Sequence, residues 1–73
     1  MPRKIRELKA DLRKAGAVQV AQVGSHTKWK HPQVPGLLIE LAGADRHDAK
    51  HYQERDVGDA LQRIHKSIQE TGA

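Results

Sequence analysis

The sequence contains no cysteine and no phenylalanine, and its aromatic residues are one Trp and one Tyr. Without cysteine the chain has no disulfide framework, no thiolate nucleophile and no cysteine-ligated zinc finger. The longest apolar run, 37–39, is far too short to cross a bilayer. The N-terminus is charged almost from its start and lacks the apolar stretch of a secretory signal. We therefore expect a cytoplasmic protein that does not associate with membranes.

Size and charge limit the possibilities further. The 73 residues form a single small domain, near the lower limit for a self-supporting core. Thirteen Lys and Arg residues against nine Asp and Glu residues give a net charge of +4. This balance favours a polyanionic partner, with nucleic acid ahead of a membrane surface. Strong periodicity among the apolar residues argues against disorder.

Apolar residues recur at helical spacing near both ends of the chain. The first set predicts a helix over 3–15, with Pro2 in its first turn and Gly16 as a left-handed C-terminal cap. The second set predicts a helix over about 53–69, in which Gly58 costs about 1 kcal/mol relative to Ala. The two sets are Ile5, Leu8, Leu12 and Ala15, and Val57, Leu61, Ile64 and Ile68.

Between these helices the period changes to two. Half-buried strands are predicted over 17–23, 26–31 and 37–41, with turns at Gly24-Ser25 and at the Pro35-Gly36 pair. The polar segment 42–51 reads as a surface loop. Short connections favour an antiparallel meander. The predicted fold class is α+β, in the order α-β-β-β-α, with two helices on one face of a three-stranded antiparallel sheet.

Side chains of the predicted second strand alternate between a core face and an open face. Thr27, Trp29 and His31 share one face, which is expected to be the core side because it carries the bulky Trp29. His26, Lys28 and Lys30 then lie together on the open face. Two lysines beside a histidine favour a neutral, base-competent imidazole. The alternative is a solvated edge strand on which lysines discourage aggregation.

Such a row of residues supplies part of what RNA strand cleavage needs. A base must take the proton of the 2′-hydroxyl, cations must stabilise charge at phosphorus, and an acid must protonate the departing 5′-oxygen. His26 and the lysines would supply the first two, and no residue of this strand supplies the acid. Ser25, Lys28 and Lys30 are candidates for phosphate contact.

Two other groups of polar residues each allow a functional and a non-functional interpretation. Arg6, Lys9 and Arg13 form one flank of the first helix, either a phosphate-binding surface or a solvated face. His47 and His51 are four residues apart, a spacing that can hold a divalent metal on a helix. They fall in the predicted loop with no third ligand fixed by spacing, so we predict no metal site. His65 is expected to be a boundary residue of the second helix.

Several segments together resemble the HicA family of toxins, which are small mRNA endoribonucleases. The central element is Gly24-Ser25-His26, followed five residues later by His31-Pro32. The opening segment 4–8 and the Ala15-Gly16 pair fit the same pattern. The segment 48–57, which begins Asp-Ala-Lys-His-Tyr-Gln-Glu, resembles a stretch found in one HicA branch. The resemblance covers nearly the whole chain, although 43–47 reads Gly-Ala-Asp-Arg-His in a loop where many relatives carry Gly and Lys.

The resemblance implies a double-stranded-RNA-binding-domain-like fold and a function. His26 would be the catalytic residue, and Gly24 would form the turn that presents it. The partner would be a HicB-like antitoxin, and the complex would associate with operator DNA through that antitoxin. We therefore expect a metal-independent and cofactor-free mRNA endoribonuclease, the toxin of a type II toxin–antitoxin system.

Two other classes of function stay open. The first alternative is a non-catalytic RNA-binding module that places Arg6, Lys9, Arg13 and the strand lysines on phosphates. It predicts salt-sensitive binding that survives loss of His26. The second is a pure interaction subunit with a protein partner and little affinity for RNA.

Overall fold

The structure is a computed structural model that describes residues 3–70, without the side chain of Glu70. Its elements are α1 (Ile5–Lys14), β1 (Val18–Val23), β2 (His26–His31), β3 (Val34–Ala42) and α2 (His51–Glu70). This confirms the predicted element order, although α2 begins two residues earlier than expected. Pro2 lies outside the described residues. Within the described chain, no helix is both long and apolar enough to span a membrane.

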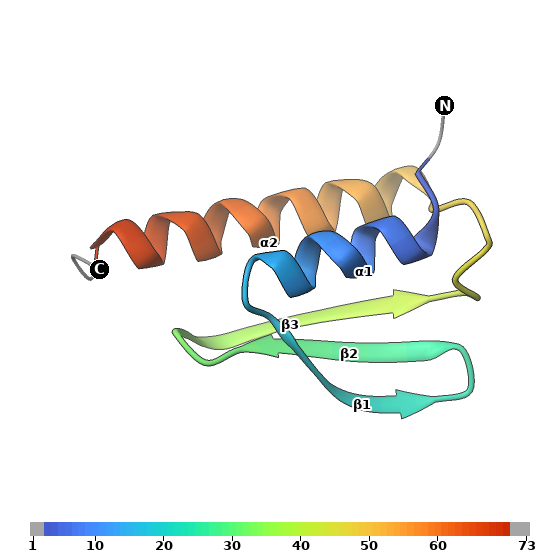
Figure 1. Ribbon diagram of the computed structural model, residues 1–73, viewed down its shortest axis with the longest axis horizontal. Helices are drawn as coiled ribbons and strands as arrows, with labels where there is room; N and C mark the ends of the chain where they lie inside the picture. The colour runs from blue at the N-terminus through green and yellow to red at the C-terminus, as the bar shows by residue number, and fades with distance from the viewer. Residues whose placement is uncertain (1–2, 71–73) are drawn as a thin grey trace.

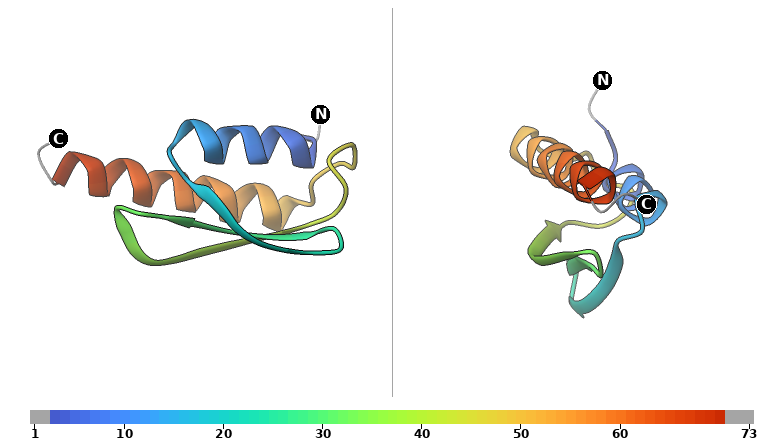
Figure 2. Two further views of the ribbon diagram at one scale, coloured as in Figure 1. Left: turned by 60° about the horizontal axis from the view of Figure 1, so that its bottom comes forward. Right: turned by 90° about the vertical axis from the view of Figure 1, so that its left-hand side faces the viewer.

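The two helices cover one face of the sheet (Figures 1 and 2). The strands are antiparallel in the order β1-β2-β3, and α1 and α2 lie side by side above them. A single apolar core fills the space between the two layers. It is built from the helix stripes and the helix-facing side chains of β2 and β3, chiefly Ile5, Leu8, Leu12, Trp29, Leu37, Ile39, Leu41, Val57, Ala60 and Ile64.

The left-handed glycine cap predicted for α1 is present. Gly16 has φ +92°, and its N–H donates to the carbonyl of Arg13. The N–H of Ala17 donates to the carbonyl of Leu12. This pair of bonds is the Schellman arrangement, which satisfies two carbonyls at the end of the helix. Both Ala17 and Leu12 are buried, so the chain leaves α1 already packed against the core.

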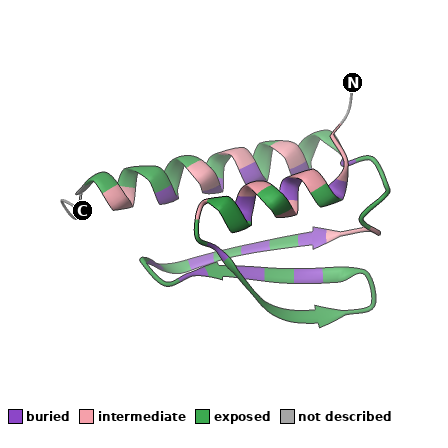
Figure 3. Cartoon of the chain, in the orientation of Figure 1, coloured by how far each residue is buried: buried purple, intermediate pink, exposed green. Residues whose placement is uncertain are grey.

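Strand β1 is not half-buried, as the sequence led us to expect, because all six of its residues are exposed. Its register places Gln19 opposite Trp29 on the helix-facing side, whereas Val23 pairs with His26 on the open side. The register shifts between Gln19 and Ala21. The helices lie over β2 and β3 and leave β1 at the uncovered edge (Figures 2 and 3). Both faces of β1 are therefore left exposed.

The Pro35-Gly36 pair is not a turn. The chain reverses at Pro32-Gln33, and β3 already begins at Val34, so Pro35 and Gly36 lie inside this strand. A proline without an N–H is tolerated there because β3 is an edge strand. Gly36 has φ +84°, and the β2–β3 register shifts between Trp29 and His31, so this end of the hairpin is irregular.

Candidate functional site

His26 opens strand β2, directly after the two-residue turn Gly24-Ser25. Gly24 has φ +60°. A residue with a side chain adopts this conformation only with strain, so glycine is preferred at such positions of tight hairpin turns. The imidazole of His26 is exposed on the open face, together with Lys28 and Lys30. Thr27, Trp29 and His31 are buried on the other face, as the alternation predicted.

Two hollows meet at His26. The α2-side hollow lies towards the start of α2, and the β1-side hollow lies over β1. The first is lined by His26, Leu38, Glu40, Ala42, Tyr52, Gln53 and Asp56, and the second by His26, Ala21, Gln22, Val23, Lys28 and Glu40. His26 and Glu40 line both. Since His26 pairs with Ala42 and Lys28 pairs with Glu40, Glu40 is a diagonal neighbour of His26 on the open face.

Glu40 changes the electrostatics expected for the open face. Its carboxylate Oε1 lies 3.9 Å from the Nζ of Lys28, and both side chains are about half exposed. An exposed pair at this distance contributes little stability, but it offsets part of the lysine charge near His26. The open face is therefore mixed in charge rather than purely cationic, with Lys30 as its other cation.

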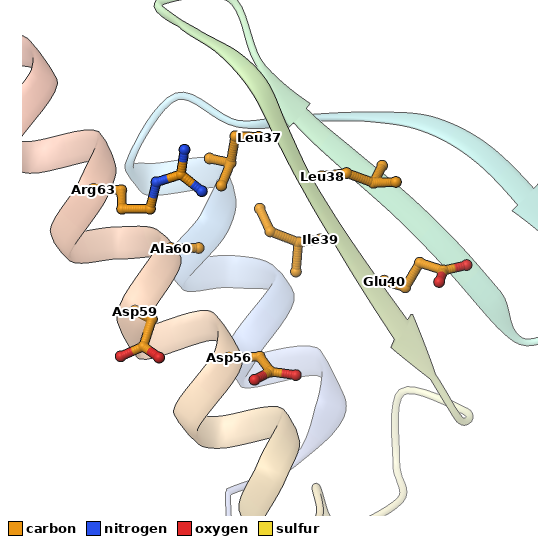
Figure 4. A pocket seen from close by; sticks show the side chains of 8 residues that line it. All are labelled: Leu37, Leu38, Ile39, Glu40, Asp56, Asp59, Ala60 and Arg63. Carbon is orange, nitrogen blue, oxygen red and sulfur yellow. The ribbon is translucent and has the colours of Figure 1, made fainter.

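A further groove, between β3 and α2, adds negative charge beside this site (Figure 4). It shares Leu38, Glu40 and Asp56 with the α2-side hollow and continues along α2 to Asp59 and Arg63. Three carboxylates and one guanidinium line it. A polyanion lying on His26 would be repelled in this direction, so the favourable approach is from β1.

The other predicted phosphate ligands do not join His26. Ser25, Lys9 and Arg13 line a separate groove on the helix-facing side of β1, which we call the α1 groove. Arg6 is exposed on the same helix but does not line this groove. The predicted set is thus divided between two sides of the sheet. The remaining residues of the α1 groove are Gln19, Gln22, Gly24, Gly43, Ala44 and Asp45.

His31, the histidine of the His-Pro segment, is buried and both of its ring nitrogens have backbone partners. Its Nε2 lies 2.8 Å from the carbonyl oxygen of Ala15, and its Nδ1 accepts the N–H of Gln33 at 3.0 Å. These partners define a neutral ring with its proton on Nε2. His31 therefore joins the end of α1 to the β2–β3 turn, and it does not face His26.

The two histidines considered for a metal, His47 and His51, lie on different elements of the structure. The backbone carbonyl of His47 accepts the N–H of Ile5 within the loop, whereas His51 is the first residue of α2. Over the described part of the chain, no group of three or more His, Cys, Asp or Glu residues is arranged to hold a metal ion. His65 is exposed on α2.

Sequence reasoning missed Glu40, Tyr52 and Asp56 near His26, and Asp45 in the α1 groove. A signal for Glu40 was present: Leu37, Ile39 and Leu41 form the core face of β3, so Glu40 must project from the open face. Comparison with protein-family models, curated proteins and solved structures found no match to this chain.

Proposed function

We propose that this protein is a HicA-type toxin with a double-stranded-RNA-binding-domain-like fold, a metal-independent endoribonuclease that cleaves mRNA and is neutralised by a HicB-like antitoxin. The observation that carries the proposal is the position of His26. The Gly-Ser-His motif stands at a tight turn, and its histidine is exposed on the uncovered sheet face where two hollows meet. A structural histidine would be packed, as His31 is.

The proposed reaction needs no group beyond side chains and the RNA itself. A base takes the proton from the 2′-hydroxyl, and the 2′-oxygen forms a bond to phosphorus. The bond from phosphorus to the 5′-oxygen breaks, and an acid gives that oxygen a proton. The products are a 2′,3′-cyclic phosphate and a free 5′-hydroxyl. His26 acts as one of the two proton-transfer groups.

Glu40 is the candidate for the other group. It is the only carboxylate that lines both hollows beside His26 among the residues that the structure describes. Its carboxylate is exposed on the open face and would take the role of base. His26 in its protonated form would then serve as the acid. Lys28 and Lys30 lie on the same face, where they would stabilise negative charge on the phosphate.

The decisive experiment uses single-stranded mRNA and purified protein in EDTA. Wild-type protein should cleave the RNA and leave 2′,3′-cyclic phosphate ends, and His26→Ala should abolish the cleavage. His65→Ala is the matched control, because His65 is also exposed but lies on α2, outside both hollows. Products with 5′-phosphate ends would refute internal attack by the 2′-hydroxyl.

Other outcomes favour the alternative functions. RNA binding without cleavage by wild type and His26→Ala alike would identify a binding module that uses the basic residues of α1 and β2. Equal cleavage by both proteins would place the activity outside His26. Little affinity for RNA, together with no toxicity when the protein is expressed alone, would point to a subunit that binds only another protein.

A further inference from the structure

The α1 groove combines the features of a phosphate-binding surface. Lys9 and Arg13 supply cations, Gln19 and Gln22 supply side-chain amides, and Ser25 supplies a hydroxyl. The backbone turns at Gly24 and Gly43 complete its wall, and the N–H of Gly43 donates to the carbonyl of Ser25 at 3.2 Å. This bond joins the two loops that border the groove.

One carboxylate already occupies this surface. The Oδ1 of Asp45 lies 2.6 Å from the Nζ of Lys9, whose side chain is only 12% exposed, whereas the side chain of Asp45 is 66% exposed. The backbone of Asp45 is fixed independently, because its carbonyl accepts the N–H of Arg6 at the start of α1. The carboxylate is thus held against a lysine whose side chain is largely covered, while the carboxylate itself remains open to solvent.

The surroundings of Asp45 are positive. Its pKa lies below the ordinary value because of the hydrogen bond from Lys9, the charge of Lys9 and the more distant charges of Arg13 and Arg6. Within residues 3–69, neither arginine has a carboxylate partner at ion-pair distance. The guanidinium of Arg13 lies over the ring of buried Trp29, 5.2 Å from its centroid, so its position is constrained by packing.

The α1 groove is continuous with the proposed catalytic site. Gln22 lines both the α1 groove and the β1-side hollow, and Ser25 directly precedes His26. A single strand that crosses the exposed end of β1 would therefore meet the α1 groove on one side and His26 on the other. The opposite approach, along α2, passes Glu40, Asp56 and Asp59.

From this arrangement we propose that the α1 groove binds a backbone phosphate of single-stranded RNA, and that the carboxylate of Asp45 occupies the position until the RNA phosphate displaces it. The inference deepens the proposed function, since it extends the RNA site from His26 around β1. Asp45 acts as a built-in competitor that weakens RNA binding. The described residues that line the groove include no aromatic ring for base stacking, so its contribution to binding does not depend on base sequence.

The test measures binding of a labelled oligouridylate in the His26→Ala background, where the RNA stays intact. Adding Asp45→Asn should tighten binding about 3- to 10-fold and steepen the dependence on salt by about one phosphate contact. The matched control is Asp48→Asn, which makes the same change in charge in the same loop. Asp48 pairs with Lys4, outside the groove, so its variant should change affinity less than about two-fold.

Removal of a cation provides the second arm. Lys9→Gln should weaken RNA binding and flatten the salt dependence, whereas Lys66→Gln, on the exposed distal part of α2, should have a much smaller effect. Equal effects of Asp45→Asn and Asp48→Asn would overturn the proposal, because net charge alone would explain them. Tighter binding of polyglutamate but not of RNA by Asp45→Asn would also overturn it, by identifying a surface for acidic proteins.

These outcomes separate the inference from the proposed function. Binding is measured without His26, so a failure of cleavage in the EDTA experiment leaves the result for Asp45 unaffected. Conversely, the combination of His26-dependent cleavage with equal RNA binding by Asp45→Asn and its control would refute only the proposed role of the α1 groove.

Discussion

The ring of His31 occupies the space that a side chain at Gly16 would need. A Cβ built on Gly16 would lie 3.0 Å from the Nε2 of His31, and that nitrogen is itself 2.8 Å from the carbonyl oxygen of Ala15. One glycine therefore meets two demands, because it adopts φ +92° and it lets the imidazole approach the end of α1. This contact joins the end of β2 to the end of α1.

A pair of glycine substitutions should have opposite effects on stability. Gly16→Ala should lower the free energy of unfolding by at least about 1–2 kcal/mol, the cost of the left-handed conformation for a residue with a Cβ. Gly58→Ala should raise it by about 0.4–1 kcal/mol, because Gly58 lies inside α2 with open space where the Cβ would be. Chemical denaturation followed by the fluorescence of Trp29 would measure both. A stabilising Gly16→Ala would contradict the contact with His31.

The two histidines of the Gly-Ser-His and His-Pro segments should separate into a functional and a structural residue. His31→Ala should lower the free energy of unfolding by about 1–3 kcal/mol, since the buried ring forms hydrogen bonds with Ala15 and Gln33. His26→Ala should change stability by less than about 0.5 kcal/mol, because its ring is exposed. Thermal unfolding would compare the two variants. A large loss of stability in His26→Ala would mean that its effect on cleavage could not be assigned to chemistry.

The sequence predicts the order and the type of the elements because each carries a clear period. The helix stripes and the alternation in β2 determine which side chains enter the core, and Trp29 identifies the core face correctly. The exposure of β1 could not be predicted in this way. It depends on where α1 and α2 rest across the sheet, which is a property of packing rather than of the local pattern in 18–23.

The site was predicted less completely than the fold. His26 was found from the alternation in β2 and from its motif, but Asp45 was not found, because its position depends on how the loop closes onto the start of α1. Lys4, the residue that caps α1, makes no side-chain capping bond; instead the carbonyls of Asp45 and His47 accept the N–H groups of Arg6 and Ile5. Backbone bonds between distant segments leave no signature in residue type.

The ion pair of Asp45 should make part of the stability depend on pH. The pKa of Asp45 in the folded protein is lowered, chiefly by the hydrogen bond from Lys9, so the charged carboxylate favours the folded state. This contribution is present above the pKa of the unfolded chain, near 4, and is lost as the pH falls through the lower folded value. The free energies of unfolding of wild type and Asp45→Asn should therefore converge on acidification.

Salt provides the control for this effect. The carboxylate of Asp45 is largely exposed, so added salt at neutral pH should also reduce the difference between wild type and Asp45→Asn. A difference that stays constant with both pH and salt would show that the asparagine alters packing or loop conformation instead of the charge interaction with Lys9.

Replacement of Glu40 should separate catalysis from RNA binding. If Glu40 takes the proton of the 2′-hydroxyl, Glu40→Gln should slow cleavage by roughly 10²–10⁴-fold. Binding of RNA should not weaken, because the substitution removes a negative charge that lies 3.9 Å from Lys28 on the proposed substrate face. Asp59→Asn is the matched control, since Asp59 lines the neighbouring groove but neither hollow beside His26. Single-turnover cleavage and equilibrium binding, measured on the same RNA, give the two quantities. Equal rates for Glu40→Gln and wild type would exclude Glu40 as the base, whereas a parallel loss of binding and cleavage would show that it positions the RNA or the strand instead of transferring a proton.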